Sequence, residues 1–402
     1  MYKVSASRIE KLFALALVCS VWTQLRVVSV IGIPELLLLY IGMCGKCSTT
    51  ETIREYQRTQ IQYVKLLMVV IPFGIAWNLL TVNNYMQMAH DLFAFVFVGF
   101  LILKVFKKVK IYENLLGILY SFFVFQTIAN IIYFGMYAVG MGMYYGERFA
   151  GFSSDPNQLG EVLFLVPWMA LYFFKKIKEQ SPQNVRSCRV ICAICVISSI
   201  IIGILTESDT FIISSVVALV IYLLMETVKI ITTGKGNKLL IVIDIIIIVF
   251  FIIKFSDIGM FMDNYYAETA QDANQLDTRK MVWLHGFQAF LHSPIVGNGP
   301  GAYSGNWFAF GNMESHNTYI YIMMDYGIIG LFALLSMLFA AWKGTRRAKS
   351  SEMSAAFISF LVFNWFHSFH RMPLFWFFIY LFISVGIAEW YPNKKEKLPA
   401  TS

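Results

Sequence analysis

The stretch that organises this sequence runs over residues 293–331 and reads SPIVGNGPGAYSGNWFAFGNMESHNTYIYIMMDYGIIGL. It begins with Gly297, Gly299 and Gly301, continues through a polar group that includes His316, and ends in an apolar helix with two further glycines. Glycine permits close backbone approach and positive φ angles. An imidazole behind such a segment, at the mouth of an apolar helix, predicts a site of chemistry.

The chain around this stretch is too apolar for a soluble protein. Of its 402 residues, 58% are hydrophobic and only 14% are charged, whereas soluble domains carry about 25% charged residues. Apolar runs near the ~20 residues that cross a bilayer recur along the whole length. The sequence therefore predicts an all-α polytopic membrane protein that forms one integral membrane domain over residues 1–402.

About twelve transmembrane helices are expected, one for each apolar segment. The first segment has no small-residue cleavage site after it, so no signal peptide is expected. The predicted segments are residues 10–25, 27–44, 62–80, 90–106, 113–136, 158–174, 189–205, 210–226, 239–254, 317–341, 354–370 and 373–390.

The basic residues predict the orientation of these helices. If both termini are cytoplasmic, 26 of the 32 lysines and arginines lie at cytoplasmic helix ends, as the positive-inside rule requires. Topology then explains the net charge of +8 without a nucleic-acid partner. The six cysteines all fall outside the predicted outer loops, so no extracellular disulfide framework is expected.

Two predicted outer loops are long, at residues 140–157 and residues 255–315. Within the second, apolar side chains recur at roughly helical spacing over residues 278–291, including Trp283. Such spacing predicts an amphipathic helix, which is expected to lie against the membrane surface.

Three arginines on the predicted outer face need an explanation, because positive charge is disfavoured there. They are Arg148, Arg279 and Arg371. A guanidinium binds phosphate oxygens through two parallel hydrogen bonds, so three converging arginines predict a diphosphate clamp. The alternative is that each arginine pairs with a local acid such as Glu147 or Asp277, or extends toward lipid headgroups.

His316 is the predicted proton-transfer group, because imidazole accepts and donates protons near neutral pH. Glu314 or Asn317 is expected to orient it, and the alternative is an interfacial histidine that caps a helix. Asp209 is expected to bind a sugar hydroxyl or to act as a base, unless it belongs to a solvated turn. His367 and His370 lack a carboxylate at similar spacing, so no metal site is expected.

In this order, these motifs resemble the O-antigen ligase and Wzy-type polysaccharide polymerase superfamily. The resemblance covers about residues 140–345. It rests on R-x-x-G-x-x-x-x-P-N at 148–157, R-x-x-x-W at 279–283, the glycines from 297, and Ser-His-Asn at 315–317. It implies a GT-C-like glycosyltransferase that acts on undecaprenyl-diphosphate-linked glycans at the outer face of the bacterial cytoplasmic membrane, without a nucleotide sugar, metal or other cofactor.

The resemblance also implies which residues carry the reaction. It assigns the family's arginine of the surface helix to Arg279 and its histidine to His316, which are the expected catalytic pair. The family often has Ser-Arg after the seventh helix, where this chain has Ser208 and Asp209, and this departure favours a polymerase over a ligase. The residues expected to bind the diphosphate or the glycan are Arg148, Asn157, Trp283, Asn317, Arg371 and Asp209.

The predicted reaction joins lipid-linked repeat units into a surface polysaccharide. His316 takes the proton of an acceptor hydroxyl, the hydroxyl attacks the anomeric carbon with inversion, and the arginines stabilise the leaving diphosphate. One alternative is ligase-type transfer of the glycan to a lipid or protein acceptor, and another is a flippase without chemistry. A chain-length regulator and a flippase of the same pathway are the expected protein partners.

Overall fold

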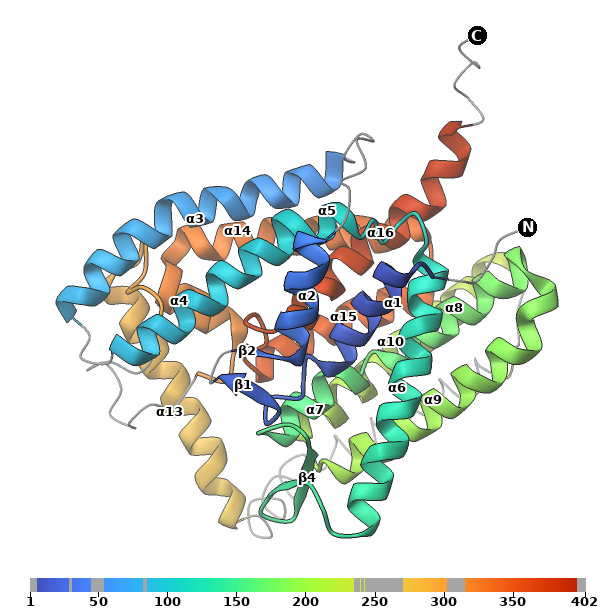
Figure 1. Cartoon of the computed structure of the whole chain (residues 1–402), viewed down its shortest axis with the longest axis horizontal. Coiled ribbons are helices and arrows are strands. Elements are labelled where there is room, and N and C mark those ends of the chain that lie inside the picture. Colours follow the sequence, from blue (N-terminus) through green and yellow to red (C-terminus); the bar gives the residue numbers. More distant parts are fainter. Residues whose placement is uncertain are drawn as a thin grey trace.

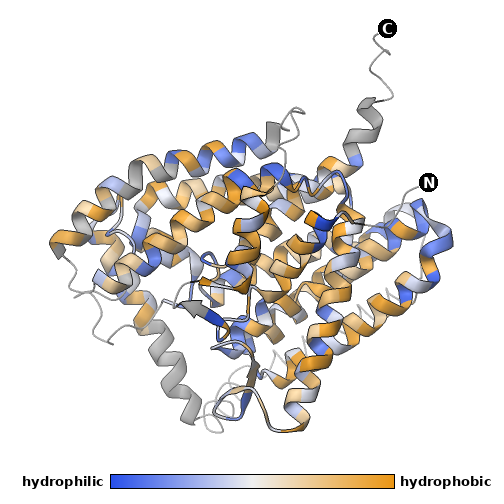
Figure 2. Ribbon diagram, in the orientation of Figure 1, coloured by the Kyte–Doolittle hydropathy of each residue, from blue (hydrophilic) through white to orange (hydrophobic). Residues whose placement is uncertain are grey.

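The computed structural model describes residues 6–28, 31–44, 54–81, 85–234, 239, 242, 270–301 and 315–395. Most of these residues are helical, and the long helices pack side by side, with α1 beginning and α16 ending toward the same side of the molecule (Figure 1). Colouring by hydropathy shows apolar residues along the middle of the helices and polar residues toward many of their ends (Figure 2). This distribution fits a polytopic membrane protein.

The described elements follow in chain order. They are α1 (Arg8–Cys19), β1 (Arg26–Val28), β2 (Ile31–Gly32), α2 (Ile33–Met43), α3 (Arg54–Thr81), α4 (Tyr85–Phe100), the π-helical η1 (Leu101–Val105), α5 (Phe106–Lys108), α6 (Leu115–Ala138), β3 (Met143–Tyr145), β4 (Arg148–Gly151), α7 (Pro156–Leu163), α8 (Val166–Gln180), the 3₁₀-helical η2 (Pro182–Asn184), α9 (Val185–Leu205), α10 (Asp209–Thr233), α13 (Ala270–His292), α14 (Thr318–Ala348), α15 (Ser351–Phe366) and α16 (Pro373–Lys395).

Eleven of the twelve predicted apolar segments contain at least one of these helices; the segment 239–254 lies outside the described residues, except for Leu239 and Val242. Within the described ranges, five helical stretches are long and apolar enough to cross a membrane, which confirms a multi-pass helical protein. The number twelve and the GT-C-like arrangement remain predictions. The five are Met88–Lys108, Leu115–Ala138, Pro182–Leu205, Asp209–Thr233 and Thr318–Ala348.

The predicted segment 158–174 is divided between α7 and α8. The division falls at Phe164 and Leu165, just before Pro167 in the first turn of α8. Proline has no N–H and its ring clashes with the carbonyl four residues earlier, so the helix restarts here. The bend leaves α7 as a short helix whose first turn contributes to the cavity described below.

The first two predicted segments form shorter helices than the sequence suggests. Helix α1 has 12 residues and α2 has 11, so at 1.5 Å per residue each is roughly 16–18 Å long, against a hydrocarbon core of ~30 Å. The antiparallel hairpin of β1 and β2 connects them. Both helices have an N-terminal glutamate, Glu10 or Glu35, that accepts a hydrogen bond from the capping residue's amide. Because Gly32 belongs to β2, the Glu35 contact also fixes the hairpin to the start of α2.

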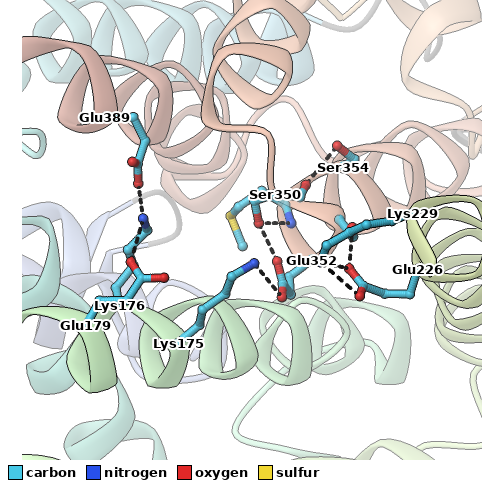
Figure 3. A network of polar contacts seen from close by, with 11 residues as sticks. Lys175, Lys176, Glu179, Glu226, Lys229, Ser350, Glu352, Ser354 and Glu389 are labelled. Carbon is cyan, nitrogen blue, oxygen red and sulfur yellow. Dashed lines mark hydrogen bonds and ion pairs between the residues drawn. The ribbon is translucent and has the colours of Figure 1, made fainter. Parts of the chain in front are cut away.

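One end of the bundle is held together by lysine–glutamate contacts (Figure 3). Lys175 Nζ on α8 lies 3.4 Å from the Glu352 carboxylate on α15, and Glu226 on α10 accepts a hydrogen bond from Ser351 at 2.7 Å. A third contact joins Lys176 on α8 to Glu389 on α16. These are helix ends that the charge distribution predicts to be cytoplasmic, and the structure groups them at one face.

Helix α14 is interrupted at Gly327, where φ is 60° and ψ is −161°. The segment after α13 fills the interruption with backbone hydrogen bonds. The amides of Asn298 and Gly299 donate to the carbonyls of Met324 and Asp325, each at 2.9 Å. After the break, the Ile328 amide donates to the Pro294 carbonyl at 2.8 Å, and the Ile329 amide donates to the Ile295 carbonyl. Backbone groups freed inside an apolar bundle must find such partners. The two segments therefore form one unit.

Candidate functional site

A cavity of about 460 Å³ lies among helix ends and turns on the side of the bundle that the charge distribution predicts to be outer. Its wall is formed by the β1–β2 hairpin, the first turn of α2, the middle of α4, and α7 with the residues just before it. His316, which precedes the N-cap of α14, and the turn between α15 and α16 complete the wall. Its ionisable lining residues are Arg26, Glu35, His90, Asp155, Glu161, His316, His367 and Arg371. An apolar bundle thus keeps acids, arginines and imidazoles together at a single pocket.

His316 faces this cavity from the turn that begins α14. Its backbone is in the left-handed region, with φ of 48°, which a non-glycine residue adopts only at some cost. The next residue, Asn317, caps α14: its side-chain oxygen accepts hydrogen bonds from the amides of Tyr319 and Ile320 at 2.9 and 3.0 Å. Asn317 thus fixes the turn that presents the imidazole. Glu314, the other predicted orienting residue, lies outside the described residues.

His367 lies beside His316, with ring centroids 6.0 Å apart and ring planes 29° apart. On its other side, His367 Nε2 lies 3.0 Å from a carboxylate oxygen of Glu161 on α7, whose side chain is fully buried. The Thr318 hydroxyl lies 2.9 Å from the His367 carbonyl oxygen and accepts a hydrogen bond from the Phe369 amide at 3.0 Å. The turn that carries His367 is therefore bound to the start of α14.

Arg371 is anchored by an acid from a distant helix. Its Nη1 lies 2.8 Å from Asp91 Oδ1 on α4, and the same carboxylate contacts the Tyr321 hydroxyl and, at 3.1 Å, His90 Nδ1. The guanidinium also lies over the Tyr321 ring, 5.3 Å from its centroid. A guanidinium has five N–H donors, more than the contact to Asp91 uses, and Arg371 also lines the cavity.

Arg26 on β1 is a second arginine of the same wall. Burial lowers the pKa of Arg26, the nearby Glu35 carboxylate raises it, and the positive charge of Arg371 lowers it. Both guanidinium groups line the same cavity, and their positive charges repel each other. An anion bound between them relieves this repulsion.

Arg148 and Asn157, two predicted binding residues, contact each other and do not line the cavity. Arg148 Nε donates to the Thr206 carbonyl at 3.2 Å and Nη2 lies 3.4 Å from Asn157 Oδ1. That oxygen also accepts a hydrogen bond from the Ser208 hydroxyl at 2.6 Å. These contacts join β4, α7 and the turn between α9 and α10.

Two further predicted residues, Asp209 and Trp283, are not among the side chains that line this cavity. Asp209 is exposed in the first turn of α10. Trp283 on α13 packs edge-on against Trp365 on α15, with ring centroids 6.2 Å apart. Arg279 lies on α13, and its side chain is outside the described part of the structure. The predicted surface helix 278–291 is present as α13, which begins earlier, at Ala270.

Sequence reasoning did not select Arg26, Glu161 or His367 as functional residues. Arg26 was detectable, since it is one of only six basic residues that the topology assigns to the outer side. Glu161 is an acid within the predicted apolar segment 158–174, which is unusual for a membrane helix. His367 could have been selected from the sequence because it lies in the same short turn as Arg371. In the described ranges, no three His, Cys, Asp or Glu side chains are grouped so as to hold a metal ion.

Comparisons with known proteins agree with part of this picture. A family model described as O-Antigen ligase matches residues 193–335. The match confirms the predicted resemblance to the O-antigen ligase and Wzy-type superfamily. It includes Asp209, Arg279 and His316, while Arg26, Glu161 and Arg371 lie outside it. A search of curated proteins found no match.

Proposed function

Because residues 193–335 match the O-antigen ligase family, we propose that this protein is a membrane glycosyltransferase that polymerises undecaprenyl-diphosphate-linked repeat units into a surface polysaccharide. The observation that carries the proposal is the cavity that combines His316 with Arg26 and Arg371. A base and two guanidinium groups are the groups that glycosyl transfer from a diphosphate carrier requires.

Each group has a defined part in the proposed reaction. His316 takes the proton from the acceptor hydroxyl, and the acceptor oxygen forms a bond to the anomeric carbon with inversion. The bond between that carbon and the diphosphate breaks, and its electron pair passes to the diphosphate. Arg26 and Arg371, joined by Arg279 from α13, stabilise the negative charge that develops there.

A narrow apolar cleft beside the cavity supports a lipid-linked donor. Arg371 lines both spaces, and the cleft continues between α4 and α14 past Phe95, Ile322 and Leu334. In the proposed complex the diphosphate lies at Arg371 and the sugars lie in the cavity. The cleft encloses about 20 Å³, so α4 and α14 have to separate there to admit the first isoprene units of the carrier. An arginine at this boundary matches a substrate whose charged and apolar parts are adjacent.

The proposed orientation places the cavity at the outer face of a bacterial cytoplasmic membrane and both termini in the cytoplasm. The bias of basic residues supports it, as does the grouping of the predicted cytoplasmic helix ends in Figure 3. Asp209, at the position where the family often has arginine, favours a polymerase. Ligase-type transfer to a lipid or protein acceptor is the second candidate.

The test is glycan profiling in a deletion strain that expresses wild-type protein, His316→Ala or Arg279→Ala at matched levels. Loss of a general base reduces rates by about 10²–10⁴-fold, so we expect His316→Ala to leave single repeat units without long polymer. His292→Ala, on α13 and away from the cavity wall, is the matched control and is expected to restore the polymer.

Other outcomes separate the competing functions. Polymer that forms but stays on its lipid carrier in the deletion strain indicates a ligase. Purified protein in detergent also distinguishes an enzyme from a flippase, since only an enzyme converts lipid-linked substrate without a sealed vesicle. Wild-type polymer from both the His316 and the Arg279 variants contradicts the proposed mechanism.

A further inference from the structure

A buried carboxylate in the cavity wall has no part in the reaction as described so far. Glu161 is fully buried on α7, and one of its oxygens lies 3.0 Å from His367 Nε2. Burying a charged group away from water is unfavourable unless it is paired. An apolar pair of similar volume would stabilise α7 against the 367–372 turn at least as well, so stability alone gives no reason for an acid here.

The placement of the pair suggests what it does. His367 lies between Glu161 and His316, in contact with the carboxylate on one side and near the predicted base on the other. The Phe363 ring packs edge-on against it, with centroids 6.0 Å apart. The other ionisable side chains of the cavity wall are Arg26, Glu35, His90, Asp155 and Arg371. Within the described part of the chain, Glu161 directly contacts His367, one member of this pair of imidazoles.

We propose that Glu161 and His367 are positioning residues for His316, and this inference rests on the function proposed above. Glu161 holds the His367 ring in place, His367 packs against His316, and the buried negative charge stabilises His316 when it has taken the acceptor proton. No further atom is transferred: the proton stays on His316 until it leaves with solvent, and Glu161 remains a carboxylate. The pair thus tunes how strong a base His316 is.

The test measures the pH dependence of polymer formation by purified protein in detergent. The substrate is the lipid-linked repeat unit extracted from a strain that lacks this gene. A nearby carboxylate favours the protonated form of an imidazole. We therefore expect Glu161→Gln to move the acid limb of the pH–rate profile to lower pH by about one unit. We also expect the plateau rate to fall about tenfold, because the base is weaker.

Two further variants keep the test decisive. Glu161→Asp retains the charge and is expected to keep the wild-type acid limb, with a smaller loss of rate. His367→Gln retains a donor toward Glu161 but removes the ring, and is expected to lower kcat more than it raises KM. His292→Ala again serves as the control that leaves the profile unchanged.

The outcomes separate this inference from the proposed function. If His316→Ala is as active as wild type, the proposed base is wrong whatever Glu161 does. If His316→Ala is inactive while Glu161→Gln retains the wild-type limb and rate, the positioning role is overturned. A Glu161→Gln protein whose yield or thermal stability falls without a shift of the acid limb also overturns it, because the pair is then structural only.

Discussion

Replacing Gly327 with alanine is expected to leave almost no folded protein. A Cβ at this position would overlap the Ile295 carbonyl, and the backbone there has φ of 60° and ψ of −161°, a conformation adopted almost only by glycine. The strain alone costs about 1–3 kcal/mol. The overlap additionally breaks the hydrogen bonds that fill the interruption of α14. Size-exclusion yield and thermal unfolding in detergent measure the loss.

A matched control separates the effect of backbone strain from the effect of the Cβ overlap. Gly234, which ends α10, also has a positive φ of 67°, but a Cβ there would meet no atom within 4 Å. Gly234→Ala therefore carries only the left-handed strain of about 1–2 kcal/mol and should give folded protein in good yield. Equal yields from the two variants would mean that the contact between residues 293–299 and α14 is not needed for folding.

Replacing Arg371 with alanine has the second largest expected effect on stability. The change leaves Asp91, which is 2% exposed, without its arginine. Removing one partner of a buried ion pair typically costs about 3–5 kcal/mol, because a buried charge remains uncompensated. We expect a large drop in the unfolding temperature in detergent, together with loss of polymer formation.

The double variant Asp91→Asn/Arg371→Ala tests this explanation, since neutralising the acid removes the uncompensated charge. The double variant should recover most of the stability. Its activity should stay absent, because the cavity still lacks Arg371. Lys229→Ala is the comparison at an exposed pair: Lys229 is half exposed beside Glu226, and such pairs contribute under about 1 kcal/mol. An Arg371→Ala protein as stable as the Lys229→Ala protein would contradict the buried-pair account.

The helices were predictable because each one is indicated by the residues of its own segment. Long apolar runs such as those of α6, α9 and α10 identify helices without knowledge of the rest of the chain. The lengths of α1 and α2 were not predictable in this way. The segment 10–25 continues to look apolar past Cys19, where the structure ends the helix and turns toward the β1–β2 hairpin.

The glycines at 297 and 299 illustrate what local signals omit. Their spacing correctly predicts that another segment packs closely against the backbone at these glycines. The sequence does not identify that segment. In the structure that partner is the interrupted α14, some thirty residues later, where a Cβ at Gly297 would overlap the Asp325 carbonyl. The glycines therefore support the interrupted middle of α14, a role that depends on tertiary pairing.

The candidate site was predictable only in part for the same reason. His316 and Arg371 are distinctive as single residues and both line the cavity. Arg148 is equally distinctive, but its hydrogen bonds hold β4 to the turn at Thr206. Glu161 gains significance only from its contact with His367, about two hundred positions later in the chain. Such pairings follow from helix packing, which the sequence alone does not supply.

The long separation between the charged partners has a consequence for biosynthesis. Asp91 and Arg371 are 280 positions apart. At about 5–20 residues per second, roughly 15–60 s of synthesis therefore separate them. During this interval the growing chain carries Asp91 of α4, and later Glu161 of α7, before Arg371 and His367 have been made. Completion of the turn at residues 367–372 places Arg371 beside Asp91 and His367 beside Glu161, so a chain truncated before this turn lacks both contacts.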